Sequence, residues 1–253
     1  MIVANWKMNG TRQSVTEWID SVSGNIDIDN INPCIFCPPV CYLEHARTLI
    51  EKHNNHLKLG SQIINSTYYD EPLTGGISAK MLKDVGAEYV IIGHSEQRGF
   101  LGKINNSRLT EDVEKALGEN LKIIFCVGED FQSKENSEHH LCLGEQLDAL
   151  GQLHSVHEDK LRSITVAYEP IWAIGSGLNA DKDYIEEMHE FIKKYINDHL
   201  GWGHLDIFPA VLYGGSVNLD NCEEIISSND VDGLLIGGAS LDSETFYKIY
   251  NLS

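Results

Sequence analysis

Eight short apolar runs recur along the whole chain, and amphipathic stretches with helical spacing separate them. Runs rich in Val, Ile and Leu without clean alternation are typical of parallel strands covered on both faces. Eight such strand and helix units suit a closed (β/α)8 barrel, and a doubly wound open sheet is the alternative. The runs are Ile2 to Trp6, Cys34 to Cys37, Leu57 to Ser61, Tyr89 to Gly93, Lys122 to Val127, Ile164 to Tyr168, Ile207 to Tyr213 and Val231 to Ile236.

Helical signals lie between these runs. Asp181 and Asn218 stand where N-caps belong, and Asn120 is expected to end a helix in the left-handed conformation. Two apolar faces have helical spacing, one formed by Val15, Trp18, Ile19 and Val22 and the other by Ile185, Met188, Ile192 and Tyr195.

No linker, low-complexity segment or charge block divides the 253 residues, so we expect residues 1–253 to form a single barrel domain with catalytic function. The formal net charge of −19 disfavours nucleic acid and anionic membranes as partners. No apolar run is long enough to span a bilayer, and the N-terminus shows no secretory pattern, which together predict a cytoplasmic location.

The cysteine and histidine clusters are weak metal signals. Cys34, Cys37 and Cys41 lack a second ligand pair at zinc-finger distance, and we expect the cysteines to be reduced thiols. The pair His139-His140 could bind metal adventitiously, but solvated helix positions are the simpler interpretation. No metal is expected in the active site.

Active sites of barrels lie at the carboxyl ends of the strands, so functional side chains are expected there. Asn5 and Lys7 flank Trp6, and strand alternation predicts that both point into the barrel mouth. The fourth strand leads into His94, Ser95 and Glu96, which bring an imidazole, a hydroxyl and a carboxylate to the same mouth. Glu96 is a candidate counter-ion for Lys7. A helix starting after His94 would keep its ring neutral.

The sixth strand delivers Glu169, which is followed at once by Pro170 and a glycine-rich loop. Proline cannot donate to a sheet ladder, so the strand should stop there, and the glycines suit a lid that closes over a small ligand. A surface glutamate in a plain turn is the alternative. The segment from Gly175 to Ala180 formally fits a dinucleotide fingerprint, but it begins too far after its strand for that role.

Paired glycines follow the seventh and eighth strands. The segments are Tyr213-Gly-Gly-Ser216-Val and Ile236-Gly237-Gly238-Ala-Ser. Backbone N–H groups at such positions approach anions closely, and barrels often bind phosphate with these two loops. Together with Gly175 in the lid, they predict a phosphate site.

With these residues in place, the motifs NWKMNG, IIGHSE, AYEPIWAIG, YGGSV and GGASL occur in the order found in the triosephosphate isomerase family, which the chain resembles along its full length. The resemblance implies interconversion of dihydroxyacetone phosphate and glyceraldehyde 3-phosphate through an enediolate. It also implies that no metal or organic cofactor is required.

The resemblance further implies a role for each strand-end residue. Glu169 would carry the proton between the two carbons, and neutral His94 would polarise the carbonyl. Lys7 and Asn5 would stabilise the developing oxyanion, with Glu96 orienting Lys7. The backbone near Gly175, Ser216, Gly237 and Gly238 would hold the phosphate.

The chain departs from the family pattern at several positions. Leu178-Asn179 replaces the usual Lys-Thr hinge pair of the lid, and Gln62-Ile63 replaces a Gln-Asn pair after the third strand. Gly76 and Gln97 replace both members of an intersubunit glutamate–arginine pair. Because no unpaired charge is left, a homodimer through the loop around Thr74 is still expected.

Two other functions compete with this interpretation. Relatives with the same catalytic residues could isomerise a longer sugar phosphate, such as a tetrulose 4-phosphate. Alternatively, the chain could be a non-catalytic binding protein on an inherited scaffold. The unaltered proton-transfer residues disfavour the second alternative.

Overall fold

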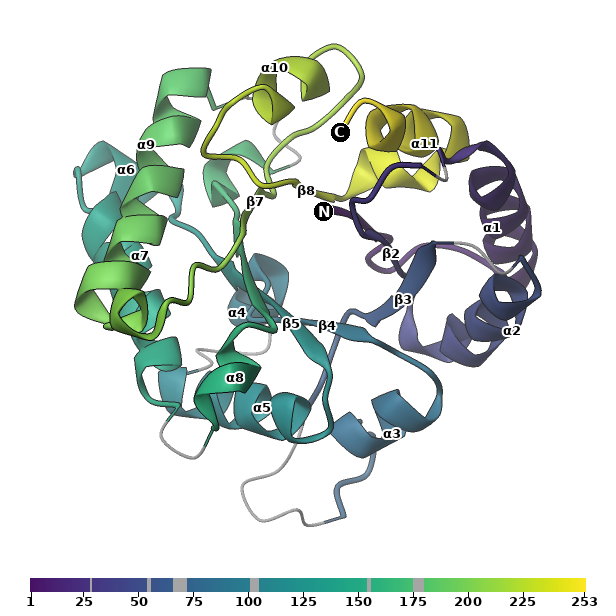
Figure 1. The fold of residues 1–253 in the computed structure, drawn as a ribbon, viewed down its shortest axis with the longest axis horizontal. Helices are drawn as coiled ribbons and strands as arrows, with labels where there is room; N and C mark the ends of the chain where they lie inside the picture. Colours follow the sequence, from purple (N-terminus) through teal and green to yellow (C-terminus); the bar gives the residue numbers. More distant parts are fainter. Residues whose placement is uncertain (28, 54–55, 66–71, 101–104, 154–155, 175–179) are drawn as a thin grey trace.

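The computed structural model describes residues 1–27, 29–53, 56–65, 72–100, 105–153, 156–174 and 180–253. Its strands pair in parallel in chain order, and β8 pairs with β1 to close an eight-stranded barrel. The predicted (β/α)8 barrel is therefore confirmed, and the open-sheet alternative is wrong. Figure 1 looks down on the ring, in which β1 lies between β2 and β8.

The strands agree closely with the apolar runs. They are β1 Ile2–Asn5, β2 Cys34–Cys37, β3 Leu57–Ser61, β4 Tyr89–Ile92, β5 Lys122–Val127, β6 Ile164–Tyr168, β7 Val211–Tyr213 and β8 Leu234–Ile236. β1 and β4 each end one residue earlier than predicted.

The last two strands begin later than predicted. Before β7, Pro209 has no N–H to donate to a sheet, and the Ile207 N–H instead donates to the Trp202 carbonyl in a turn. Before β8, Gly233 has a φ of 150°, where a Cβ would lie 1.9 Å from the Met1 carbonyl oxygen. Regular strand geometry therefore starts only after this glycine.

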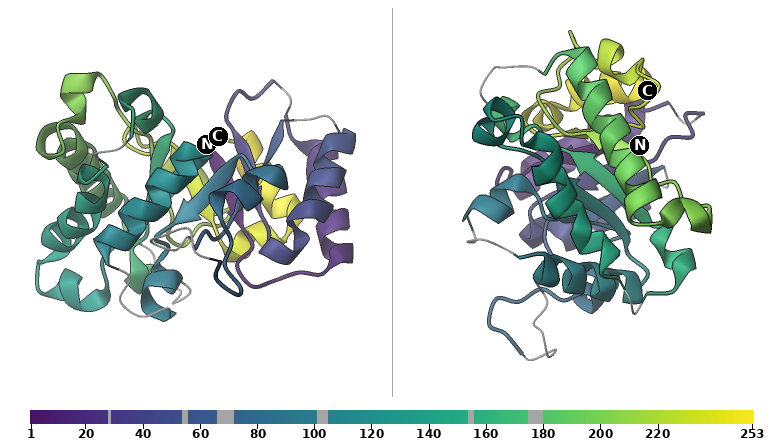
Figure 2. Two further views of the ribbon diagram at one scale, coloured as in Figure 1. Left: turned by 90° about the horizontal axis from the view of Figure 1, so that it is seen from below. Right: turned by 90° about the vertical axis from the view of Figure 1, so that its left-hand side faces the viewer.

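The helices surround the strands on the outside, as the side views in Figure 2 show. They are α1 Arg12–Asn25, α2 Leu43–His53, α3 Ala79–Asp84, α4 Ser95–Phe100, α5 Asn106–Gly118, α6 Phe131–Glu135, α7 His139–Gly151, α8 Glu158–Leu161, α9 Lys182–Lys194, α10 Cys222–Ile226 and α11 Ser243–Asn251. Short 3-10 turns span Val40–Tyr42, Ile171–Ala173, Trp202–Leu205 and Gly238–Leu241, and a π-helical turn at Tyr195–His199 extends α9. None of the described helices is long and apolar enough to cross a membrane.

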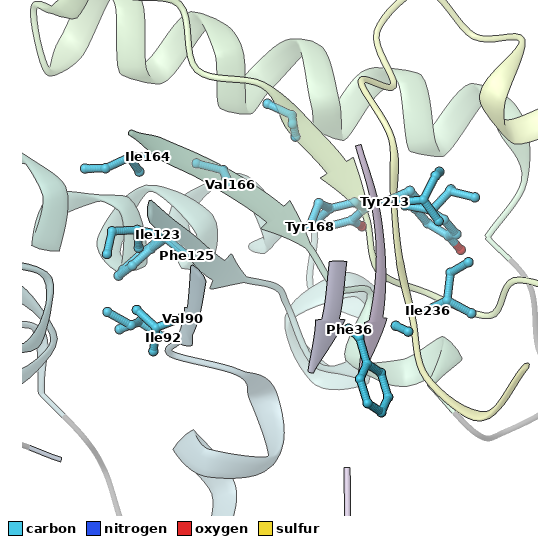
Figure 3. Close-up of a cluster of buried hydrophobic side chains, with 14 of the residues drawn as sticks. Phe36, Val90, Ile92, Ile123, Phe125, Ile164, Val166, Tyr168, Tyr213 and Ile236 are labelled. Carbon is cyan, nitrogen blue, oxygen red and sulfur yellow. The ribbon is translucent and has the colours of Figure 1, made fainter. Parts of the chain in front are cut away.

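Strand side chains alternate between two buried clusters. Val3, Ala167 and Leu235 belong to the smaller cluster, which fills the barrel interior. Their neighbours in sequence belong to the larger cluster between the strands and the helices. Figure 3 shows part of that outer cluster, including Phe36, Phe125 and Ile236. This alternation determines which side chains at the strand ends point into the mouth of the barrel.

The predicted helix faces and two of the three predicted caps are present. Val15, Trp18, Ile19 and Val22 of α1 are buried, as are Ile185, Met188 and Ile192 of α9, whereas Tyr195 is half-buried. Asp181 caps α9, and Asn120 has a φ of 58° after α5. Asn218 does not cap a helix, because its side chain accepts the N–H groups of Asp220 and Asn221 in a turn, and α10 begins at Cys222.

The Asp181 cap offers a test of the α9 assignment. Its carboxylate accepts the Tyr184 N–H at 2.9 Å, so Asp181→Ala should lower the free energy of unfolding by about 1 kcal/mol. Asp181→Asn keeps an acceptor oxygen and should recover most of that loss. Urea unfolding followed by circular dichroism measures both changes. Equal losses in the two variants would contradict a capping role.

Candidate functional site

A cavity of about 370 Å³ opens at the carboxyl ends of the strands. It collects most of the strand-end residues predicted to act together, although they come from distant parts of the sequence. The lining residues are Asn5, Trp6, Lys7, Asn9, His94, Glu169, Ile174, Gly214, Gly215, Ser216, Val217, Leu235, Gly237, Gly238 and Ala239. Ser95 and Glu96 lie behind this lining and contact Glu169 and Lys7. Gly175 lies outside the described residues.

Glu169 follows the interior residue Ala167 by two positions, so its side chain continues the inward face of β6. The residue is 2% exposed. One carboxylate oxygen lies 2.9 Å from the His94 Nε2, and the other accepts the Ser95 N–H at 3.0 Å. A Cβ on Gly214 would come within 3.0 Å of the Glu169 Cγ, so a glycine there leaves room for the carboxylate. Glu169 is therefore a buried carboxylate and not a surface glutamate in a turn.

Opposing effects act on the pKa of Glu169. Burial alone would raise it, because a carboxylate loses hydration inside the protein. The interaction with His94, the Ser95 N–H and the charge of Lys7 outweigh that loss and hold the pKa below its ordinary value. Glu169 is thus a carboxylate, and not a carboxylic acid, at neutral pH.

His94 is oriented by the turn between β4 and α4. Gly93 adopts a φ of 76°, and the helix begins at the next residue after His94. The Glu96 N–H points at the His94 Nδ1 at 3.2 Å, so that nitrogen acts as the acceptor. We therefore assign the single ring proton to Nε2, which faces both Glu169 and the cavity. A neutral imidazole of this tautomer can donate a hydrogen bond to a ligand oxygen.

Lys7 reaches the cavity by a different route from the one predicted. β1 ends at Asn5, and Lys7 has a φ of 51°, so strand alternation does not orient it. Instead, the buried Asn5 side chain accepts the Lys7 N–H at 3.0 Å and holds the turn. The expected ion pair is present, with 2.8 Å between the Lys7 Nζ and a Glu96 carboxylate oxygen. Trp6 packs on Trp18 and Phe36.

The two glycine loops are fixed from behind. After β8, the Ser240 carbonyl accepts the indole N–H groups of Trp6 and Trp18 at 3.2 and 2.8 Å. After β7, the Asn221 amide donates to the Ser216 carbonyl at 3.0 Å. Gly237, Gly238 and Ser216 line the cavity, with backbone of the kind that binds anions.

Glu129 was missed in the sequence analysis. It is fully buried two residues after β5, and one of its carboxylate oxygens accepts hydrogen bonds from Tyr168, Trp172 and Tyr184. Burial raises the pKa of Glu129, and these three donors offset only part of the effect. Trp172 belongs to the short 3-10 turn between Glu169 and residues 175–179, so Glu129 anchors the start of the predicted lid. The one signal in the sequence was the position of Glu129 two residues past the end of an expected strand, where functional side chains are expected.

Arg98 is a second functional residue that the sequence analysis missed. Its guanidinium donates to the Gly93 carbonyl at 2.7 Å and to the Cys126 carbonyl at 3.0 Å. It thereby ties the turn that carries His94 to the end of β5. Nothing in a lone arginine after a histidine indicates this role.

The positions that depart from the family pattern have local explanations. Gln97 donates to the Gln62 carbonyl at 2.8 Å, so it joins two segments of the same chain. Gly76 closes a tight turn with the Leu73 carbonyl, and a Cβ there would lie 3.0 Å from that oxygen. A glutamate would be crowded at this position. Leu178 and Asn179 lie outside the described residues.

The fold and the cavity define a class of protein. A (β/α)8 barrel with a buried carboxylate, a neutral imidazole and a lysine at its carboxyl-terminal mouth has the groups that proton-transfer enzymes need. The family model described as triosephosphate isomerase matches residues 1–253.

Curated relatives extend this result over nearly the full length. The triosephosphate isomerase of Nitrosomonas europaea is 37% identical over 249 residues, which cover 98% of this chain and 95% of the relative. That of Alkaliphilus oremlandii is 35% identical over 253 residues, which cover 99% and 98%. The chain belongs to the triosephosphate isomerase family.

The titration of Glu169 tests the geometry of the site. We expect carbon-13 NMR of labelled glutamate to show a Glu169 pKa below the ordinary value, and Lys7→Met to raise it by removing a cation. Because the folded-state pKa is depressed, ionised Glu169 stabilises the fold above its unfolded-state pKa. That stability is lost as the pH falls through the folded-state pKa. The distant exposed variant Lys248→Met is the control, and a Glu169 pKa above the ordinary value would contradict the assignment.

Proposed function

We propose that this chain interconverts dihydroxyacetone phosphate and glyceraldehyde 3-phosphate, and that residues 1–253 act as one catalytic domain. The observation that carries the proposal is the Glu169–His94 pair, which faces Lys7 inside a single cavity bordered by two glycine loops. Proton abstraction beside a carbonyl needs a carboxylate base, a donor for the oxyanion and a water-poor pocket. The cavity contains the first two, and closure of the lid would supply the third.

Glu169 is the base in this mechanism. It takes a proton from the carbon beside the carbonyl, which gives an enediolate, and returns a proton to the neighbouring carbon. The depressed pKa keeps it ionised at neutral pH. In the present geometry both carboxylate oxygens are engaged by His94 and Ser95, so Glu169 must exchange these contacts to reach the substrate.

His94 and Lys7 stabilise the charge that develops on oxygen. The His94 Nε2–H donates to the carbonyl oxygen and passes protons between the two oxygens of the enediolate. Lys7 supplies the positive charge. A Glu96 carboxylate oxygen lies 2.8 Å from the Lys7 ammonium group and holds it in place, and Glu96 itself does not line the cavity. Asn5 holds the Lys7 backbone and adds an amide at the same wall.

The substrate phosphate is held by backbone N–H groups of Ser216, Gly237 and Gly238. We include Gly175 in this set from the family resemblance alone. Such binding explains how a chain with a net charge of −19 accepts an anion, because the positive potential is local. Closure of residues 170–180 over the phosphate would exclude water and protect the enediolate.

We further propose that the enzyme works as a homodimer in the cytoplasm. The loop around Thr74 carries the exposed side chain of Leu73 and leads into α3, at the lower edge of Figure 1. Met8 and Met81 are also exposed apolar side chains, and such surfaces suit a subunit contact. All the cysteines are free thiols, which suits a reducing compartment.

Removal of the base tests the mechanism directly. Glu169→Ala should lower kcat by at least about a thousandfold, because the carboxylate acts in the chemical step. Glu88→Ala, which removes a half-buried carboxylate that pairs with Lys58 outside the cavity, should leave kcat unchanged. A coupled assay with glyceraldehyde 3-phosphate measures both variants, and an undiminished rate for Glu169→Ala would exclude the mechanism.

The same assay run with erythrulose 4-phosphate separates the substrates, since a clear preference for that four-carbon sugar would overturn the triose assignment.

Charge placed in the predicted contact should separate the subunits. Thr74→Arg buries a large unpaired charge in each half of a symmetric interface, so sedimentation velocity should show a shift from dimer to monomer. Phe208→Arg adds the same charge at an exposed apolar position before β7 and should leave the dimer intact. Wild-type protein that sediments as a monomer, or a dimer unaffected by Thr74→Arg, would contradict the proposed interface.

A further inference from the structure

Three potential metal ligands meet on the outside of the barrel, between α7 and α9. His139 and His140 open α7, and Glu187 lies in the middle of α9, which runs beside α7 in Figure 1. One ring nitrogen from each histidine and one carboxylate oxygen all lie within 4.8 Å of one another. Within the described part of the chain, no other three His, Cys, Asp or Glu residues converge in this way. None of the three lines the catalytic cavity.

Neighbouring aromatic rings hold both imidazoles in place. The His139 and His140 rings meet edge to face, with centroids 4.5 Å apart. His139 also packs on Tyr184 at 5.8 Å, and His140 stacks on Phe191 at 4.3 Å. Both of those aromatic residues belong to α9, the helix that carries Glu187. The two rings are therefore pre-oriented toward the carboxylate, which reduces the entropic cost of binding an ion.

The ring nitrogens have unused bonding capacity. The Nδ1 of His139 and the Nε2 of His140 are buried and have no hydrogen-bond partner among the described residues. A Glu187 carboxylate oxygen lies 3.4 Å from the His140 Nε2 and 4.0 Å from the His139 Nε2. Buried polar atoms without partners are uncommon, and a metal ion bound beside Glu187 would accept the lone pair of the unpartnered His140 Nε2.

The distances suit a small transition-metal ion. Zinc bonds to histidine nitrogen and carboxylate oxygen at about 2.0–2.2 Å, which separates tetrahedral ligand atoms by roughly 3.4 Å. The present cluster, whose ligand atoms lie within 4.8 Å of one another, must therefore contract by at most about 1.4 Å. The Glu187 side chain is 54% exposed, so it can make that movement without disturbing the core. A site with two histidines and one carboxylate leaves a fourth position for water.

We propose that His139, His140 and Glu187 form a binding site for a divalent transition-metal ion, with Zn²⁺ the ion that fits this donor set and these distances. The Glu187 carboxylate is essential, because the amino-terminal end of α7 otherwise presents partial positive charge to a cation. A bound ion joins α7 to α9 and stabilises the folded chain through preferential binding to it. The site is structural, and it takes no part in the proton transfer at Glu169.

Calorimetric titration of the full-length protein with Zn²⁺ tests this site. Wild-type protein should bind one Zn²⁺ per chain, and saturating Zn²⁺ should raise its melting temperature. His140→Gln and Glu187→Gln should each weaken binding by at least about tenfold and reduce the thermal shift at a given Zn²⁺ concentration. Because both side chains are partly exposed, neither change should impair folding, and circular dichroism checks this. Co²⁺ should give visible absorption bands of a nitrogen and oxygen site that disappear in the same variants.

His53→Gln is the matched control. His53 lies 2.6 Å from the Asp20 carboxylate, so it forms a histidine–carboxylate pair, but no third ligand joins that pair within the described residues. Its loss should leave the Zn²⁺ affinity unchanged. Wild-type affinity in both the His140 and Glu187 variants, or an equal loss in His53→Gln, would overturn the proposal.

Discussion

Closure of the sheet into a ring of parallel strands is the constraint on which the site depends. Because the strands run in one direction, their carboxyl ends share one rim. Because side chains alternate, the residue two positions beyond an interior residue faces the mouth. Asn5, Glu169 and Gly237 each follow an interior residue by two positions. Without closure, these three positions would lie along the edge of an open sheet.

The ring interior also sets the electrostatics of the site. A carboxylate that is 2% exposed loses most of its hydration, and an unpaired buried charge costs several kcal/mol. Hydrogen bonds to a charged group each return about 1.5–3 kcal/mol, so the bonds from His94 and Ser95, together with the charge of Lys7, suffice to keep Glu169 ionised. Glu129 has three neutral hydrogen-bond donors, and its pKa moves in the opposite direction. The contacts of Glu169 with His94 and the Ser95 N–H, with the charge of Lys7 added, separate the pKa values of the two acids more than burial does.

Sequence patterns predicted those features that depend on local chemistry. The apolar runs predicted β2, β3, β5 and β6 residue by residue, and the strand-end rule found His94 and Glu169. The failures arose where distant contacts decide the geometry. The close approach of Met1 to Gly233 delays β8, and the Asn5 side chain, not alternation, orients Lys7. The donors that make Glu129 important come from β6, the 3-10 turn after it and α9, and they lie 39, 43 and 55 residues from Glu129 in the sequence.

The shared Ser240 carbonyl has a consequence for observing the enzyme at work. Trp6 and Trp18 both donate to it, directly behind the glycine loop after β8, and Trp172 donates to Glu129 at the start of the lid. The chain has four tryptophans in all, and Trp202 is the fourth. Three of its four indoles are therefore hydrogen-bonded next to the candidate site, two behind the glycine loop after β8 and one beside the segment that follows Glu169. Intrinsic fluorescence can therefore test the proposed binding of phosphate at the glycine loop after β8 and the proposed closure of residues 170–180, without any added label.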